Sequence, residues 1–176
     1  MASIACSLRA VARPAVMRFA PRAAVRTFTT SRMGNPFTDN VARTALAKKY
    51  TKDHEWVDLS ADRKSATIGI SQYASDQLGD VVYVELPETT GDFVEAGDAI
   101  GAVESVKSAS DINAPIKCKV VQGNVLLEEK PSTINQVPED DSKGGGWIVK
   151  VEVDEQGAKE FDELMDAEAY KTFTSE

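Results

Sequence analysis

The chain has 176 residues, 42% of them hydrophobic, with 20 basic and 28 acidic side chains and a net charge of −8. This length suits one ordinary domain with a tail, and no apolar run is long enough to cross a bilayer. One histidine and two cysteines are too few soft ligands for a structural zinc site, so a metal centre is not expected.

The first 35 residues differ in composition from the rest of the chain. They contain six arginines, no lysine and no acidic residue, and the first carboxylate is Asp39. This composition is typical of a mitochondrial presequence, because a cationic helix is drawn across a membrane that is negative inside. The arginines interrupt every candidate apolar run of a secretory signal. We therefore predict a cleaved presequence over residues 1–35, a linker over residues 36–48, and localisation in the mitochondrial matrix.

Removal of residues 1–35 would make the protein strongly acidic. It leaves 14 basic residues against 28 acidic ones, a net charge of −14. Nucleic-acid phosphates would be repelled by such a chain. The charge instead favours docking onto basic protein surfaces, with electrostatic steering of the encounter. The alternative explanation is that the acidic surface serves only solubility.

The remaining sequence predicts short strands separated by turns. Alternating or β-branched segments bounded by glycine and proline indicate five strands, at residues 67–71, 81–86, 99–103, 116–122 and 147–153. In the last of these, Trp147 is expected to share a face with Val149, Val151 and Val153.

Short helices are expected between and after these strands. Ser71 has the character of a helix N-cap, and Gly79 ends the helix that follows it. Residues 124–142 are polar and contain two prolines, which predicts a loop with a short helix. At the end of the chain, apolar residues recur at helical spacing and predict a helical tail: Phe161, Leu164, Met165, Tyr170 and Phe173.

This order of elements predicts one mainly β domain over residues 49–176. We expect a flattened β-barrel or sandwich with short peripheral helices and a C-terminal helix. The glycines at 144–146 follow no strand and open no helix, so a phosphate-binding loop is not expected.

One lysine occupies the tip of a predicted hairpin between Gly101 and Pro115. Lys107 lies between an apolar strand and a second short strand, where its amine would remain in water. The ordinary pKa of a lysine, about 10.4, leaves little free amine at neutral pH, so a modifying enzyme must bind and align it. From the local pattern alone, a solvated charge is the better explanation.

A wider resemblance changes this interpretation. The run Glu104-Ser-Val-Lys-Ser-Ala-Ser-Asp111 resembles the lipoylation motif of the glycine cleavage system H proteins. Further stretches resemble the same family in the same order, and together they span roughly Lys49 to Phe173: residues 50–57, 66–70, 77–87, 131–135, 146–147 and 166–170. The resemblance implies a fold of the lipoyl-domain type, a barrel-sandwich hybrid.

The same resemblance implies a carrier rather than an enzyme. Lipoate would be attached to Lys107 as an amide by lipoyl-attaching enzymes. The arm would take the aminomethyl group of glycine from a pyridoxal-phosphate-dependent glycine decarboxylase to a tetrahydrofolate-dependent aminomethyltransferase. Dihydrolipoyl dehydrogenase would then reoxidise it. The redox chemistry belongs to the cofactor, and the protein supplies presentation.

A loaded arm of this kind carries an amine that a carboxylate suits well. By their positions in the motifs, Glu55 and Asp111 are the candidates for a cleft that shelters it, and the alternative for each is an ordinary surface acid. His54 is expected to be a structural hydrogen-bonding residue rather than a base. Gln77 stands where some family members have histidine, and Ser108 where alanine is common.

Neighbouring carrier classes have different residues around their lysine. Lipoyl domains of acyltransferases usually have Asp-Lys-Ala and biotin carriers Met-Lys-Met, whereas Val106 precedes Lys107 here. Two alternatives remain: a lipoyl carrier or relay that serves 2-oxoacid dehydrogenase complexes, and an interaction module with an unmodified lysine. An enzyme is disfavoured, because the sequence offers no nucleophile–base pair, metal cluster or phosphate loop.

Overall fold

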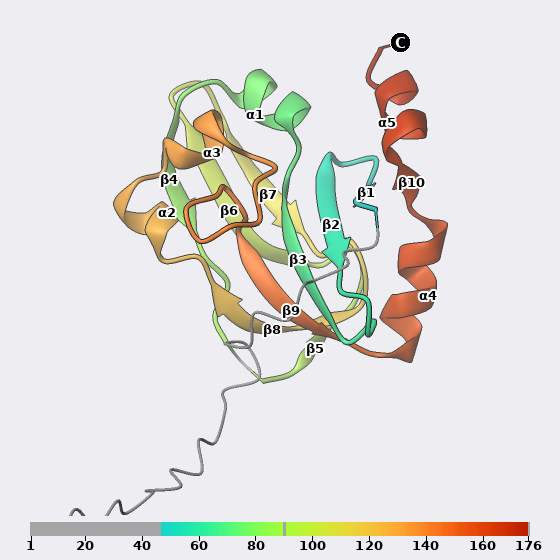
Figure 1. Cartoon of the computed structure of the whole chain (residues 1–176). Coiled ribbons are helices and arrows are strands. Elements are labelled where there is room, and N and C mark those ends of the chain that lie inside the picture. Colours follow the sequence, from blue (N-terminus) through green and yellow to red (C-terminus); the bar gives the residue numbers. More distant parts are fainter. Residues whose placement is uncertain (1–46, 90, 176) are drawn as a thin grey trace, which may run out of the picture. The chain divides into compact units, whose positions relative to one another are not determined.

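The computed structural model describes residues 47–89 and 91–175, which form two antiparallel sheets with short helices around them (Figure 1). The larger sheet has seven strands in the order β10-β1-β2-β3-β9-β8-β5. In chain order its strands are β1 (Lys49–Tyr50), β2 (Glu55–Leu59), β3 (Ser65–Ile70), β5 (Phe93–Val94), β8 (Cys118–Gly123), β9 (Val149–Val153) and β10 (Met165–Asp166).

The smaller sheet holds the predicted lysine hairpin. It consists of β4 (Val81–Glu85), β6 (Ala99–Ser105) and β7 (Ala109–Asn113), in the order β4-β6-β7. Strands β6 and β7 pair in register up to Glu104 and Ala109. The residues between these two therefore form the tip of the hairpin, and Lys107 is one of them.

Five helices are present in the described residues: α1 (Gln72–Leu78), α2 (Leu126–Glu129), α3 (Thr133–Gln136), α4 (Glu155–Glu163) and α5 (Ala167–Phe173). The predicted cap of α1 is confirmed, because the Ser71 hydroxyl accepts a hydrogen bond from the Ala74 N–H at 3.1 Å. Gly79 ends this helix with φ of 77°, a conformation that glycine adopts without strain.

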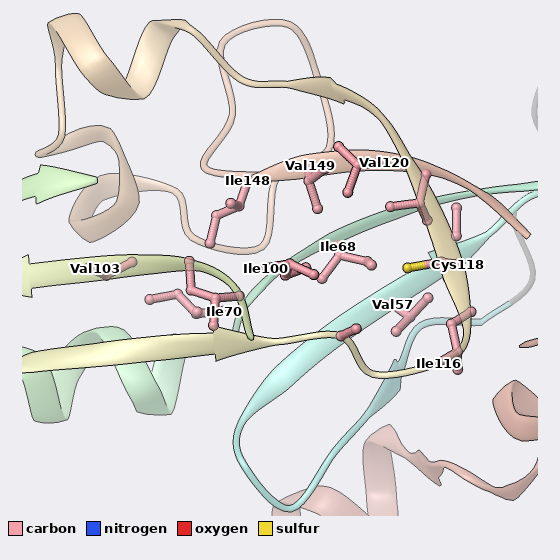
Figure 2. Close-up of a cluster of buried hydrophobic side chains, with 14 of the residues drawn as sticks. Val57, Ile68, Ile70, Ile100, Val103, Ile116, Cys118, Val120, Ile148 and Val149 are labelled. Carbon is pink, nitrogen blue, oxygen red and sulfur yellow. The ribbon is translucent and has the colours of Figure 1, made fainter. Parts of the chain in front are cut away.

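The core lies between the two sheets and is made of aliphatic side chains that alternate along the strands. Val57, Ile68 and Val149 face it from the larger sheet and Val103 from the smaller one, all fully buried (Figure 2). Cys118 lies in the same core, and burial raises the pKa of its thiol to about 12. The expected mainly β architecture is therefore confirmed.

The predicted helical tail is interrupted. Met165 and Asp166 form β10, which pairs antiparallel with β1, so α4 and α5 are two separate helices beside that edge of the sheet (Figure 1). The apolar residues on the two sides of the break pack in different clusters: Phe161 and Leu164 contact the main core, whereas Met165 and Tyr170 belong to the cluster around Trp56. The Asp166 carboxylate then caps α5 by accepting the Ala169 N–H at 2.8 Å.

The prediction that Trp147 shares a face with the valines of the last predicted strand is also wrong. Val149, Val151 and Val153 belong to the main core, whereas Trp147 packs in a second buried cluster with Tyr50, Trp56 and Tyr170. The strand begins only at Val149, so the two-residue alternation does not extend back to Trp147.

Gly69 lies opposite the indole of Trp56, so substitution of this glycine should disturb the second cluster. Gly69 pairs with Trp56 across β2 and β3, and a Cβ at Gly69 would lie 2.7 Å from the indole Cζ2. We expect Gly69→Ala to lower the free energy of unfolding by about 1–3 kcal/mol, because the indole must shift. Urea denaturation measures this. Gly144→Ala is the matched control, since a Cβ there meets no atom within 4 Å; equal stability of the two variants would contradict the prediction.

Within the described residues, no helix is long and apolar enough to cross a membrane. The predicted presequence, residues 1–35, and residues 36–46 of the predicted linker lie outside the described part of the chain.

Candidate functional site

The hairpin tip is closed by one serine. The Ser105 hydroxyl accepts hydrogen bonds from the backbone N–H groups of Lys107 at 3.1 Å and Ser108 at 3.0 Å, and it donates to the Ser108 carbonyl at 3.0 Å. The Ser105 N–H donates to the same carbonyl at 2.8 Å. Sequence reasoning did not single out Ser105, although serine side chains commonly bond the backbone two or three residues on.

Lys107 is exposed at this tip, and its side chain lies against the end of α1. A Cβ built on Gly79 would lie 3.2 Å from the Lys107 Nζ and 3.3 Å from its Cε. The residue before the lysine is fixed to the same segment, because the Val106 N–H donates to the Asp80 carbonyl at 3.1 Å. The structure thus presents one amine on a backbone that is bonded on both sides.

A pocket of about 220 Å³ lies beside the tip. Ser108, the neighbour of Lys107, is one of its lining residues. The others come from the loop before β2 and the first residue of β2, from β3 and α1, and from β6 and β7. Its lining residues include the apolar Ile70, Ala74, Leu78, Val103 and Ile112 and the polar or charged Asp53, His54, Glu55, Gln77, Ser108, Ser110 and Asp111. The two predicted cleft acids, Glu55 and Asp111, therefore line one pocket.

The two acids differ in exposure. Glu55 is 2% exposed, and its carboxylate accepts hydrogen bonds from the Asn113 N–H at 3.2 Å and from the Thr51 hydroxyl. Burial raises the pKa of Glu55, although these hydrogen bonds act in the opposite direction. Asp111 lies on β7 and is exposed. The ion pairs identified within residues 47–89 and 91–175, Arg63–Asp162 and Lys117–Glu95, involve neither acid.

His54 anchors the end of the loop that leads into β2, directly before Glu55. It adopts a positive φ of 74°, and its Nδ1 lies 2.8 Å from the hydroxyl of Tyr170 on α5. The Ser71 hydroxyl lies 2.7 Å from the same oxygen, and the Ser71 N–H donates to the His54 carbonyl at 2.8 Å. This geometry gives His54 the hydrogen-bonding contact that the sequence led us to expect, and it also places His54 in the pocket wall.

Loss of the Tyr170 hydroxyl should loosen this anchor. We expect Tyr170→Phe to lower the free energy of unfolding by about 1 kcal/mol, because the variant loses the contacts with His54 and Ser71. The control is Tyr83→Phe, since Tyr83 is 51% exposed. Thermal denaturation of both variants measures the difference, and an unchanged midpoint for Tyr170→Phe would contradict the proposed anchor.

In the described part of the chain, no group of three or more His, Cys, Asp or Glu side chains could hold a metal ion. The site consists of one presented lysine beside a pocket that combines an apolar wall with carboxylates.

Comparison with known proteins identifies the family of this chain. The sequence model of the glycine cleavage H-protein family matches residues 48–176. The chain belongs to this family. The H protein of Thermotoga maritima is 46% identical over 129 residues, which cover 73% of this chain and 97% of that protein. The mitochondrial H protein 2 of Arabidopsis thaliana is 43% identical over 159 residues, covering 87% and 96%.

A solved structure supports the same conclusion. The crystal structure of an H protein from Mycobacterium marinum matches with a TM-score of 0.62 and 34% identity, covering 73% of this chain and 97% of that chain. Family membership confirms the sequence-based prediction of a non-catalytic lipoyl carrier of the glycine cleavage system.

Proposed function

We propose that Lys107 is the residue that carries the lipoyl arm, as an amide on Nζ. The observation that supports this most strongly is the placement of an exposed lysine on a closed hairpin tip, next to Ser108, which lines a pocket together with Glu55 and Asp111. Acylation removes the positive charge of the lysine and leaves a long neutral arm. When bound, the lipoyl group supplies a disulfide that accepts the aminomethyl group and two electrons.

The pocket fits an arm of this chemistry. Its apolar wall, including Leu78, Val103 and Ile112, suits the hydrocarbon part of the arm. Glu55 and Asp111 would hold the ammonium of the cargo, and such a cation would favour the charged form of the buried Glu55. Ser108 and Ser110 add hydroxyls to the same lining. The role of this chain's residues is therefore to hold and shelter the cargo between partners.

The partners proposed are the other components of the glycine cleavage system, and family membership supports them. They are a pyridoxal-phosphate-dependent glycine decarboxylase, a tetrahydrofolate-dependent aminomethyltransferase, dihydrolipoyl dehydrogenase, and the enzymes that attach lipoate. The tether raises the effective concentration of the arm at each partner site. The acidic surface of the processed chain favours docking onto basic faces of these enzymes.

The compartment proposed is the mitochondrial matrix, with residues 1–35 removed on import. The composition of that segment supports this, as does similarity to a mitochondrial relative over 87% of the chain.

One measurement tests the attachment site and the compartment together. The protein is isolated from mitochondria, its intact mass is determined, and peptides around Lys107 are mapped. A single lipoyl amide on Lys107 and a chain that starts near Pro36 are expected. An unmodified Lys107, in cells that lipoylate their other carriers, would overturn the proposal and indicate an interaction module.

A further inference from the structure

Asn135 fixes the segment on which the lysine tip rests. Its side-chain Nδ2 donates to the Gly79 carbonyl at 2.7 Å, and its Oδ1 accepts the Val81 N–H at 2.9 Å. The amide also donates to the Ser75 hydroxyl at 3.3 Å. One side chain from α3 therefore bonds both sides of Asp80, 54 to 56 residues away along the sequence.

The segment 79–81 in turn supports the hairpin tip at two points. The Asp80 carbonyl, which lies between the two groups held by Asn135, accepts the Val106 N–H at 3.1 Å. The Lys107 side chain lies over Gly79, close enough that a Cβ there would be 3.2 Å from Nζ. The position of the amine thus depends on a segment whose own position depends on Asn135.

We infer that Asn135 is a positioning residue for the acylation of Lys107. The inference rests on the proposed function, because it concerns the same lysine. In acylation, the neutral amine of Nζ forms a bond to the acyl carbon of an activated lipoyl donor. The bond from that carbon to its activating group breaks, the activating group leaves with the electron pair, and the proton that Nζ loses passes to the leaving group or to water. Asn135 touches none of these atoms. It holds the backbone that sets where Nζ is offered, and displacement of a reacting group by about 1 Å is costly to rate.

The test uses the full-length, unmodified chain as the substrate of a lipoyl-attaching enzyme. Asn135→Ala removes the clamp. Asn124→Ala is the matched control, because the buried Asn124 amide also donates to two carbonyls, those of Gly145 at 3.0 Å and Trp147 at 2.7 Å, and bonds no residue of the tip. At a temperature where both variants are folded by circular dichroism, we expect kcat/KM for Asn135→Ala to be lower than for the control, on the order of tenfold.

Two further readouts separate positioning from general loss of stability. Hydrogen exchange of the Val106 amide should be faster in Asn135→Ala than in Asn124→Ala. The rate at which a small amine-reactive reagent modifies Lys107 should be equal in both, because the lysine is exposed in either case. Asn135→Asp keeps the acceptor for Val81 and loses the donor to Gly79, so its kcat/KM should fall between the wild type and Asn135→Ala.

Gly79→Ala provides a test that leaves Asn135 in place. The new Cβ would lie 3.2 Å from Nζ of the lysine, and a residue other than glycine is strained at the φ of 77°, so slower lipoylation is expected here as well. If the wild type is lipoylated on Lys107 and Asn135→Ala is modified as fast as Asn124→Ala, the inference about Asn135 is wrong and the proposed function stands. If the wild type is not lipoylated, both are overturned.

Discussion

Replacement of Lys107 by arginine should abolish lipoylation and leave the fold intact. The guanidinium group stays protonated and offers no amine for acylation. Because Lys107 is exposed, the free energy of unfolding should change by less than about 0.5 kcal/mol. Intact mass after incubation with a lipoyl-attaching enzyme measures the first effect, and urea denaturation measures the second.

The carrier function should disappear together with the modification. Glycine-dependent CO2 exchange with the partner decarboxylase is expected to fall to background in Lys107→Arg. Lys143→Arg is the control, because Lys143 is another exposed lysine and lies outside the hairpin and the pocket lining. If Lys107→Arg still gains the mass of a lipoyl group, or still supports glycine-dependent CO2 exchange, the arm is attached to another residue of the chain.

Replacement of Glu55 by glutamine should shorten the life of the loaded arm. Glutamine keeps the shape of the side chain but has no negative charge, so it loses the hydrogen bond between a carboxylate and an ammonium. Loss of such a bond, about 1.5–3 kcal/mol, corresponds to release of the one-carbon unit that is roughly 10- to 100-fold faster. Mass spectrometry of the loaded protein over time measures this. Glu128→Gln is the control, because Glu128 is an exposed acid on α2. Equal lifetimes of the loaded arm in the two variants would show that Glu55 does not hold the cargo.

The same substitution should change how the stability of the unmodified protein depends on pH. The pKa of Glu55 is raised by burial in the folded state, so between its ordinary value of 4.5 and the raised value the folded protein binds more protons than the unfolded chain. The contribution of Glu55 to stability therefore falls as pH rises through this window and is constant above it. The stability of Glu55→Gln relative to the wild type should rise over the same window.

Denaturation in urea at a series of pH values between about 3 and 8 tests this sign. A stability difference between Glu55→Gln and the wild type that stays constant over the series would contradict a raised pKa for Glu55. Asp111→Asn serves for comparison, because Asp111 is exposed and lies in the same pocket.

The features that sequence predicted well are those encoded by neighbouring residues. The cap at Ser71, the stop at Gly79 and the hairpin around Lys107 each depend on side chains within a few positions of the backbone they affect. Such local preferences do not depend on contacts with residues far away in the sequence.

The features that sequence missed depend on contacts between distant residues. Tyr170 reaches His54 across 116 positions, and Asn135 reaches Gly79 across 56. Neither contact leaves a periodic pattern in the sequence. The pairing of β10 with β1 is likewise decided by packing at the sheet edge, which overrides the helical spacing of the tail.

The burial of Cys118 has a consequence for a protein that is proposed to carry a lipoyl disulfide on Lys107. Thiol–disulfide exchange requires a thiolate that can reach the sulfur it attacks, and a thiol with a pKa of about 12 inside the core supplies neither the charge nor the access. Cys6, the other cysteine of the sequence, lies in the segment proposed to be removed on import. The processed carrier would therefore contain no cysteine able to capture its own arm as a mixed disulfide, and the oxidised and reduced arm would remain available to partner enzymes.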